Sequence, residues 1–423
     1  MSVGFRKRID SLFAEWDKKN SPGCVVGVIN NGKFIFKKGY GMAYLENSVP
    51  ITPKTVFRVA SLSKQFTAMC AALLIDSGKL SLNDSVRKFV PELPKYNYPV
   101  QVKHLIYHTS GLPDYLELMT LSGLSEADYY TADDVLKLLS RETKLIYRPG
   151  LRFQYCNTGY FLLSLIVQRV SGLSLREFAA ENIFKPLGMS STHFHDNHSM
   201  LVKNIAEGYM PDGSGGFTIE GTNVDIVGDG GLYTTLEDLY LWDQNYYNNK
   251  LGVHKKDLMK MFLSPGKLNN GESTGYAFGV WYMNYKGLLR MSHAGEFVGF
   301  RTQMIRFPKQ KFSVFVLSNA SSFNEFRAAS RVADIFLGDK LKIKGYAGEY
   351  YSSVLDAVYN IIIRDSNLYL INKHLPEEFL EPVDADLFKT ANKLLHFVRN
   401  KQGHVSNIIL DNDVVKAVKF IKR

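Results

Sequence analysis

The sequence predicts a mixed α/β (α+β) fold: a central antiparallel sheet flanked by helices, an inserted helical subdomain, and a small C-terminal all-β domain of barrel type. Three patterns predict this fold. Strand-like stretches occur near residue 24 and again near residue 300, helical periodicity fills most of residues 80–285, and short alternating stretches dominate the end of the chain. We therefore expect one domain over residues 1–338 and a second over residues 339–423.

The N-terminal elements are predicted from periodicity and turn chemistry. Residues 4–18 place apolar side chains on one helical face, and Ser21-Pro22-Gly23 ends that pattern. Cys24–Ile29 and Phe34–Lys38 are predicted to form the two strands of a hairpin, because the intervening Asn31-Gly32 is a preferred two-residue turn. A helix is expected from Ser61 to Gly78, since apolar residues recur there at helical spacing.

The remaining elements are predicted in chain order. Further helices are predicted at Leu82–Val90, Thr131–Leu139, Gly159–Val170 and Leu236–Trp242, and a closing helix at Ser321–Leu337. Strands are predicted at Tyr276–Asn284, Leu288–Ser292, Gly299–Phe307 and Phe312–Ser318. In the tail, short strands are expected at Tyr359–Arg364, Leu368–Ile371, Leu395–Val398, Val405–Leu410 and Val414–Ile421, which favours a barrel or half-barrel.

Composition limits the possible partners. The net charge of +10 comes from scattered residues, with no basic tract, so nucleic acid is not an expected partner, while a mild attraction to anionic substrates or surfaces remains open. No apolar run approaches a membrane span, and the N-terminus lacks a signal-peptide pattern. As written, the chain predicts a cytoplasmic protein, and a trimmed leader would leave an exported form open. Cys24, Cys70 and Cys156 form neither a disulfide framework nor a metal-binding pattern.

Three short motifs carry candidate chemistry. Ser61 is expected at a helix N-terminus, where developing negative charge is favoured, and Lys64 lies one turn later on the same face. A serine with an adjacent amine is a plausible activated nucleophile. The same spacing recurs at Ser85–Lys88 and Ser264–Lys267, so it is weak alone. Its significance comes from two motifs further along the chain, Tyr155-Cys156-Asn157 and His293-Ala294-Gly295.

In this order, with their flanks, the motifs resemble those of the serine β-lactamase and penicillin-binding-protein superfamily. The resemblance is strongest to the branch of class C β-lactamases, D-aminopeptidases, D-alanyl-D-alanine carboxypeptidases and esterases. It covers about residues 5–337 and rests on Phe57–Lys64, His108–Leu112, Pro149–Gly150, Phe153–Tyr160, Pro186–Met189, Gly230–Leu232 and His293–Gly295.

The resemblance implies a role for each matching residue. Ser61 would attack an acyl carbonyl, with Lys64 and Tyr155 sharing the proton transfer; which of the two is the base stays open. Asn157 would bind the substrate amide and orient Lys64. The backbone N–H groups of Ser61 and of Glu296, the residue after His293-Ala294-Gly295, would form the oxyanion hole. No metal or other cofactor is implied.

Two residues depart from the usual pattern. His293 stands where typical penicillin-binding proteins have Lys, and an imidazole is usually neutral near pH 7. This lowers the expectation of efficient β-lactam hydrolysis and fits the peptidase and esterase members. Cys156 stands where Ser is usual, and we interpret it as a passive small residue.

The sequence thus predicts a serine hydrolase that forms an acyl-enzyme with a small-molecule or short-peptide substrate: a D-amino-acid or short peptide, or a small ester, with weak β-lactam acylation. The C-terminal domain is expected to cover the cleft or to mediate a homo-oligomer. One alternative is a catalytically silent penicillin-binding-like module. Another is a metallohydrolase that uses His193–His198, although that segment lacks a usual zinc-ligand order.

Overall fold

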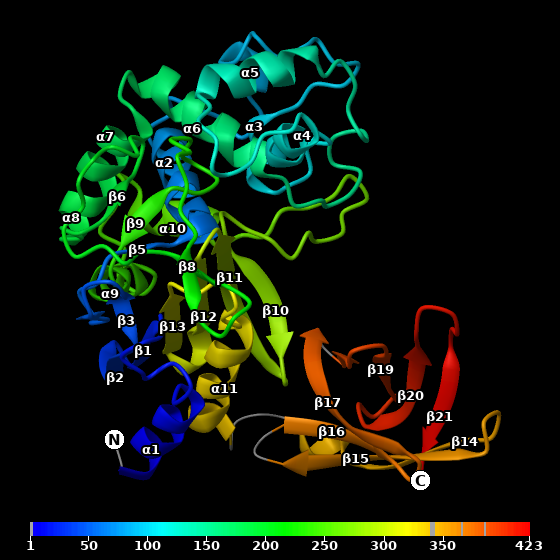
Figure 1. Cartoon of the computed structure of the whole chain (residues 1–423). Helices are drawn as coiled ribbons and strands as arrows, with labels where there is room; N and C mark the ends of the chain where they lie inside the picture. Colours follow the sequence, from blue (N-terminus) through cyan, green and yellow to red (C-terminus); the bar gives the residue numbers. More distant parts are fainter. Residues whose placement is uncertain (1–2, 339–342, 365–366, 385) are drawn as a thin grey trace. The chain divides into compact units, whose positions relative to one another are not determined.

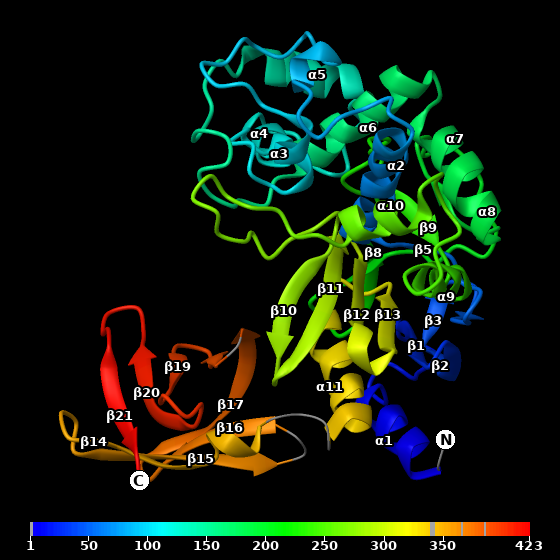
Figure 2. The same cartoon turned by 180° about the vertical axis from the view of Figure 1, so that it is seen from behind.

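The computed structural model describes residues 3–338, 343–364, 367–384 and 386–423 (Figures 1 and 2). The chain divides into two compact units. The first comprises Met1–Tyr282, Ser292–Arg306 and Gln310–Ala329, and the second comprises Met283–Met291, Phe307–Lys309 and Ser330–Arg423. In the described part of the chain, no helix is both long and apolar enough to cross a membrane.

A six-stranded sheet in the order β10-β11-β12-β13-β1-β2 joins strands from both ends of the first 338 residues. Its members are β1 (Cys24–Asn30), β2 (Lys33–Tyr40), β10 (Trp281–Tyr285), β11 (Leu288–Phe297), β12 (Phe300–Phe307) and β13 (Phe312–Ser318). Strand β1 pairs antiparallel with both β2 and β13, as the blue and yellow strands of Figure 1 show. The predicted central antiparallel sheet and its N-terminal hairpin are confirmed. Asn31 and Gly32 both adopt positive φ, as a two-residue hairpin turn requires.

The helices mostly lie between the two halves of the sheet in sequence. They are α1 (Val3–Leu12), α2 (Lys64–Asp76), α3 (Val102–Ile106), α4 (Tyr115–Leu121), α5 (Ala132–Arg141), α6 (Asn157–Ser171), α7 (Leu175–Ala179), α8 (Lys185–Leu187), α9 (Leu236–Asn245), α10 (Lys255–Phe262) and α11 (Glu325–Leu337). Helix α2 is buried along almost its whole length. It packs against α6, and the two helices lie side by side in both views. Its position at the centre of the hydrophobic core holds the residues before it rigidly.

Short strands connect these helices. They are β3 (Met42–Tyr44), β4 (Val49–Pro50), β5 (Phe57–Arg58), β6 (His193–Phe194), β7 (Tyr209–Pro211), β8 (Phe217–Ile219) and β9 (Leu232–Thr234). The first strand of a three-stranded sheet, in the order β5-β9-β6, lies directly before Ser61 in sequence. Here β5 pairs antiparallel with β9, with Arg58 opposite Tyr233. This pairing ties the start of α2 to the glycine-rich segment Gly228–Gly231.

Several predicted elements differ from the structure. Leu82–Val90, predicted as a helix, contains only the 3₁₀ turn Val86–Lys88, because Val86 N–H donates to the distant Val100 carbonyl. The strand predicted at Val414–Ile421 begins at Val418.

Helix α1 ends at Leu12, although periodicity extended it to residue 18, because tighter i→i−3 turns begin when Phe13 N–H donates to Asp10 O. Strand β10 begins at Trp281 instead of Tyr276, since Gly279 at φ 77° breaks the extended backbone. For α1 and β10 the predicted type of element is correct, and a local turn shortens the element relative to the prediction.

The C-terminal segment forms a closed antiparallel barrel of eight strands, which confirms the predicted barrel-type domain. The strands are β14 (Gly348–Ser352), β15 (Ala357–Arg364), β16 (Asn367–Asn372), β17 (Leu375–Asp384), β18 (Leu387–Lys389), β19 (Leu394–Arg399), β20 (Val405–Asp411) and β21 (Val418–Lys422). The last strand closes the barrel by pairing with both β20 and β14. Tyr350, Phe397 and Phe420 belong to its buried interior.

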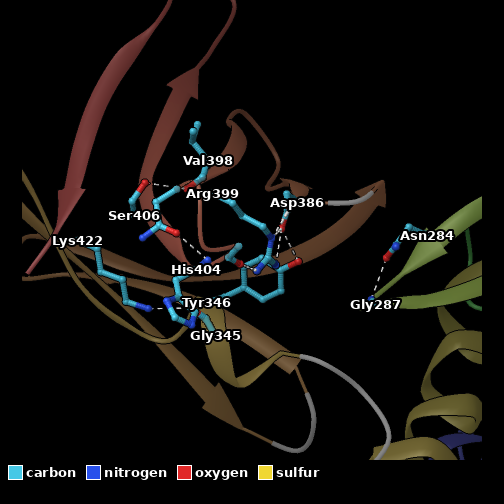
Figure 3. Close-up of polar contacts among 12 residues, drawn as sticks. Asn284, Gly287, Gly345, Tyr346, Asp386, Val398, Arg399, His404, Ser406 and Lys422 are labelled. Carbon is cyan, nitrogen blue, oxygen red and sulfur yellow. Dashed lines mark hydrogen bonds and ion pairs between the residues drawn. The ribbon is translucent and has the colours of Figure 1, made fainter.

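A polar cluster, drawn in Figure 3, supports one side of the barrel. The Asp386 carboxylate accepts a hydrogen bond from Tyr346 Oη at 2.7 Å and two from the Arg399 guanidinium at 2.7 and 2.9 Å. The guanidinium also lies 5.3 Å from the centre of the Tyr346 ring. These contacts link the turn before β18 to the end of β19, so the cluster has a structural role.

Candidate active site

Lys64, the first residue of α2, is fully buried and links three segments of the chain. Its Nζ donates hydrogen bonds to Ser61 Oγ at 3.1 Å, to Asn157 Oδ1 at 2.8 Å and to the Asp229 carbonyl oxygen at 2.6 Å. An ammonium group has three donors, and all three have acceptors here. The arrangement can therefore move a proton to or from the Ser61 hydroxyl while Asn157 holds the amine in place.

Ser61 lies in a 3₁₀ turn, Ala60–Ser63, that directly precedes α2. The sequence placed it at the N-terminus of the α-helix itself, so the structure moves it one turn earlier. The preceding residue, Ala60, has φ 47°, a left-handed conformation that is unfavourable for a residue with a Cβ. Ser63 holds this turn, because its hydroxyl donates to the Ala60 carbonyl and accepts from Leu232 N–H at 3.0 Å. The strained backbone turns Ser61 toward the cavity.

Tyr155 lies beside Lys64, whose Nζ is 4.9 Å from the centre of the phenol ring. The buried His108 ring also packs against it, 4.3 Å from the Tyr155 ring with an interplanar angle of 30°. His108 Nδ1 accepts a hydrogen bond from Cys156 N–H at 3.1 Å. Burial, then the charge of Lys64 and the proximity of His293, hold the pKa of His108 well below its usual range. His108 is thus a neutral support for Tyr155.

Asn157 begins α6, and an acidic residue that the sequence pattern did not single out fixes its position. Asp114 Oδ2 accepts a hydrogen bond from Asn157 N–H, and Asp114 Oδ1 accepts one from Leu116 N–H at the start of α4. One carboxylate therefore joins the first turns of two helices. The sequence did contain one signal for this residue. Aspartate is a preferred N-cap, and Asp114 directly precedes Tyr115, the first residue of α4.

His293 is buried on β11, and both of its ring nitrogens have partners. Nδ1 donates to the Ala294 carbonyl at 2.6 Å, so Nε2 is left to accept a hydrogen bond from Tyr276 Oη at 2.9 Å. Burial, and then the charge of Lys64, lower the pKa of His293 to about 3. The imidazole is neutral at physiological pH and supplies no positive charge. Nothing in the sequence pattern marked Tyr276 as its partner.

Gly295 brings β11 against the segment that carries Ser61. A Cβ on Gly295 would lie 2.2 Å from the Val59 carbonyl oxygen and 3.2 Å from the Ser61 nitrogen, so only glycine fits there. Thr302 Oγ1 lies within hydrogen-bonding distance of both the Val59 and the Gly295 carbonyl oxygens. The residue after Gly295 is Glu296, whose side chain points largely into solvent. These contacts place the Ser61 N–H beside the end of β11.

A cavity of about 340 Å³ opens in front of Ser61. Its polar lining includes Tyr155, Asn157, His293 and Glu296 together with Ser61. Its apolar wall is formed by Tyr115, Leu116, Val224, Ile226, Trp281 and Phe297. The volume falls within the range of small-molecule sites. Every predicted site residue is therefore either in the cavity lining or, for Lys64 and Gly295, in direct contact with Ser61 or its neighbours.

Asp229, in the glycine-rich segment Gly228–Gly231, is buried against the site and was not predicted. Its Oδ2 accepts a hydrogen bond from Tyr115 Oη at 3.0 Å, while its backbone carbonyl accepts from Lys64. Burial raises the pKa of the Asp229 carboxyl, and the charge of Lys64 opposes that effect. Gly228 has φ 119°, and a Cβ on it would lie 2.7 Å from the Tyr160 carbonyl oxygen, so glycine is required where this segment passes α6.

Cys156 and the His193–His198 segment make contacts of other kinds. The Cys156 thiol is buried under the Leu112 carbonyl at 3.5 Å, and burial raises its pKa to about 12. His193 Nε2 and His195 Nδ1 lie 3.2 Å apart, whereas His198 turns away to Asp225. Across the residues that the structure describes, no group of three or more His, Cys, Asp or Glu side chains is placed to hold a metal ion.

Comparison with known proteins identifies the family to which this chain belongs. Penicillin-binding protein 4* of Bacillus subtilis is 31% identical over 348 residues, which cover 78% of this chain and 75% of that protein. The D-aminopeptidase of Brucella canis is 28% identical over 317 residues, which are 75% of this chain and only 60% of that enzyme. The octameric penicillin-binding protein homologue from Pyrococcus abyssi has a TM-score of 0.69 at 25% identity and covers 100% of both chains. The family described as "Beta-lactamase" matches residues 9–338, and the chain therefore belongs to the beta-lactamase family of serine hydrolases.

Proposed function

We propose that this chain is an active serine hydrolase that forms an acyl-enzyme on Ser61 from an amide or ester substrate. The observation that carries the proposal is the buried Lys64 amine, hydrogen-bonded to Ser61 Oγ and held by Asn157 Oδ1 and a backbone carbonyl. A buried amine in contact with a serine hydroxyl can stabilise the alkoxide as it forms and transfer its proton.

The reaction is derived from the positions of the groups. Ser61 Oγ attacks the substrate carbonyl, and Lys64 and Tyr155 share the transfer of the hydroxyl proton. The oxyanion is bound by the Ser61 and Glu296 N–H groups; one such donor typically contributes about 3 kcal/mol to transition-state stabilisation. The same proton then goes to the leaving amine or alcohol, and water hydrolyses the acyl-enzyme.

The substrate that we propose is a D-amino-acid or short-peptide amide, or a small ester. A cavity of about 340 Å³ with an apolar wall suits an acyl group of that size. The names of the relatives support the choice, since they include a D-aminopeptidase and a penicillin-binding protein. The neutral His293 supports weak β-lactam acylation over efficient hydrolysis, because it cannot attract the carboxylate of a β-lactam by charge.

Intact-mass measurement after incubation with a fluorophosphonate, and separately with a penicillin-type probe, tests the proposal. One adduct is expected on the wild type and none on Ser61→Ala. Ser85→Ala is the matched control, because Ser85 and Lys88 repeat the same spacing. It should keep the adduct. A wild type that forms no adduct with either probe would favour a silent binding module.

A substrate panel then identifies the reaction. Nitrophenyl esters, D- and L-aminoacyl anilides and nitrocefin should give Ser61-dependent turnover that is highest for an ester or a D-aminoacyl anilide and lowest for nitrocefin. Nitrocefin as the best substrate would contradict the argument from His293.

We also propose that the chain self-associates. Support comes from the octameric homologue of Pyrococcus abyssi, which is matched over the full length of both chains. Light scattering coupled to gel filtration should give a mass that is a multiple of 47.9 kDa. A mass of one chain at micromolar concentration would contradict this proposal.

A further inference from the structure

Arg58 lies in the catalytic cavity but has no part in the reaction described above. It is the last residue of β5, three positions before Ser61, and it lines the same cavity as Ser61, Gly231 and Phe297. Only 4% of its surface is exposed. A long cationic side chain is thus almost entirely buried at the wall of a substrate-sized space.

The Arg58 guanidinium has aromatic neighbours but no hydrogen-bonding partner. Its central carbon lies 4.7 Å from the centre of the Phe297 ring and 5.9 Å from that of Tyr233. Within the described ranges it makes no hydrogen bond or ion pair, and its Nε is sealed from solvent without an acceptor. The two rings hold the group in place while its donors stay unused.

The two carboxylates that line the cavity, those of Asp229 and Glu296, interact with groups other than Arg58. Asp229 receives the hydrogen bond of Tyr115 Oη, and the basic group nearest to Glu296 is Arg301, with Nε 4.0 Å from the carboxylate. Neither approaches Arg58 within ion-pair distance. The cavity therefore contains a fixed positive charge that the protein itself leaves unneutralised.

Arg306, another buried arginine of this chain, is paired with a carboxylate, as buried charges usually are. It is 1% exposed, and its NH2 lies 2.6 Å from Asp243 Oδ1, while its guanidinium stacks on Tyr246 at 3.4 Å. Burying a charge without a partner is strongly unfavourable, and arginine cannot escape by losing its proton. An unpaired buried arginine that borders a cavity is therefore best explained by an anion that arrives with the ligand.

We propose that Arg58 is the anion-binding subsite of the catalytic cavity and that it receives a carboxylate of the substrate. A guanidinium presents parallel N–H donors that match the two carboxylate oxygens. The inference rests on the proposed function, because it assumes that the substrate occupies the Ser61 cavity. It places a positive charge at a different residue of the cavity from His293, and it narrows the proposed substrate class to amides or esters whose carboxylate reaches Arg58.

A binding experiment tests the subsite without any turnover. Calorimetric titration of the Ser61→Ala protein with glutarate and with its neutral isostere glutaramide should give about tenfold or more preference for glutarate. The preference should weaken as salt is raised. Equal affinity for the two ligands would overturn the proposal, and this comparison needs no change at Arg58.

Variants then assign the preference to one residue. Arg58→Gln in the Ser61→Ala background should remove the preference for glutarate, and Arg58→Lys should keep part of it because the charge remains but the paired donors are lost. Arg301→Gln is the matched control, since it removes a neighbouring positive charge outside the catalytic cavity. A folded Arg58→Gln protein that still prefers glutarate would refute the assignment.

Turnover distinguishes where the carboxylate sits on the substrate. Hydrolysis of nitrophenyl hexanoate is compared with that of the nitrophenyl monoester of adipic acid, and phenyl acetate with 3-carboxyphenyl acetate. Arg58→Gln should lower kcat/KM about tenfold or more for the charged member of one pair only, which identifies the acyl or the leaving-group side. An equal loss on charged and neutral esters would indicate a structural role and refute the proposal. If no ester is hydrolysed, the proposed function fails while the glutarate titration still decides the role of Arg58.

Discussion

Glu325, in the first turn of α11, provides a pH-dependent test of the structure. Only 6% of its surface is exposed, and burial, followed by the negative charge of Glu296, raises its pKa from 4.5 to about 7. Between these two values the folded protein keeps a proton that the unfolded chain has lost. The free energy of unfolding therefore falls as pH rises from 4.5 to about 7, and the full penalty persists at higher pH. At about 1.4 kcal/mol per pH unit, the penalty is about 3 kcal/mol.

Glu325→Gln keeps the shape of the side chain but cannot ionise. The variant should match the wild type near pH ~4 and exceed its stability by up to about 3 kcal/mol above pH ~7, less about 0.3–1 kcal/mol for the lost helix-dipole interaction. Urea unfolding from about pH 4 to about pH 8.5 measures this through tryptophan fluorescence, because Trp16, Trp242 and Trp281 all lie in the first compact unit.

The control is Glu117→Gln, an exposed carboxylate in the first turn of α4, which should show no such pH-dependent gain. If the wild type and Glu325→Gln give parallel stability profiles across the whole range, the raised pKa and the reasoning built on it are wrong.

Three further predictions concern the site and its support. Gly295→Ala should slow acylation about 10²–10³-fold in a stopped-flow burst assay, because the added methyl displaces β11 from the Ser61 amide; near-normal acylation would contradict the oxyanion-hole assignment. Asp243→Asn should lower the free energy of unfolding by about 3–5 kcal/mol in urea titration by leaving Arg306 buried without a counter-charge, whereas the Asp243→Leu/Arg306→Met double variant should lose less. Tyr276→Phe should cost about 1–3 kcal/mol in the same assay, since His293 Nε2 loses its donor, and an unchanged midpoint would refute that hydrogen bond.

Much of the fold could be predicted because its signals are local. The two-residue turn at Asn31-Gly32 determines where the first hairpin reverses direction. The three-residue spacing of Ser61 and Lys64 brings their side chains together on the same side of one helical turn. The proximity of Asn157 to Lys64 could not come from spacing, since 93 residues separate them; only the resemblance to a known family implied it.

The rest depends on contacts between distant segments. Arg58 lies in a strand of only two residues, too short to show which way its side chain points or that it ends up buried beside Phe297. The Tyr276–His293 hydrogen bond likewise joins a turn to a strand through tertiary packing alone. Periodicity reports the face on which a residue lies and carries no information about the partner that it meets there.

The way in which the barrel closes has a practical consequence for handling the protein. Its final strand, β21, pairs with two neighbours, and Phe420 on that strand is fully buried against Tyr359, with ring centres 4.5 Å apart. A premature stop before Val418 would uncover the backbone of β14 and β20 at once and leave an opening where Phe420 had been. Exposed strand backbones recruit strands from other molecules. Such truncated chains should therefore collect in inclusion bodies, and an affinity tag at the C-terminus needs a flexible spacer so that it does not pull the last strand away.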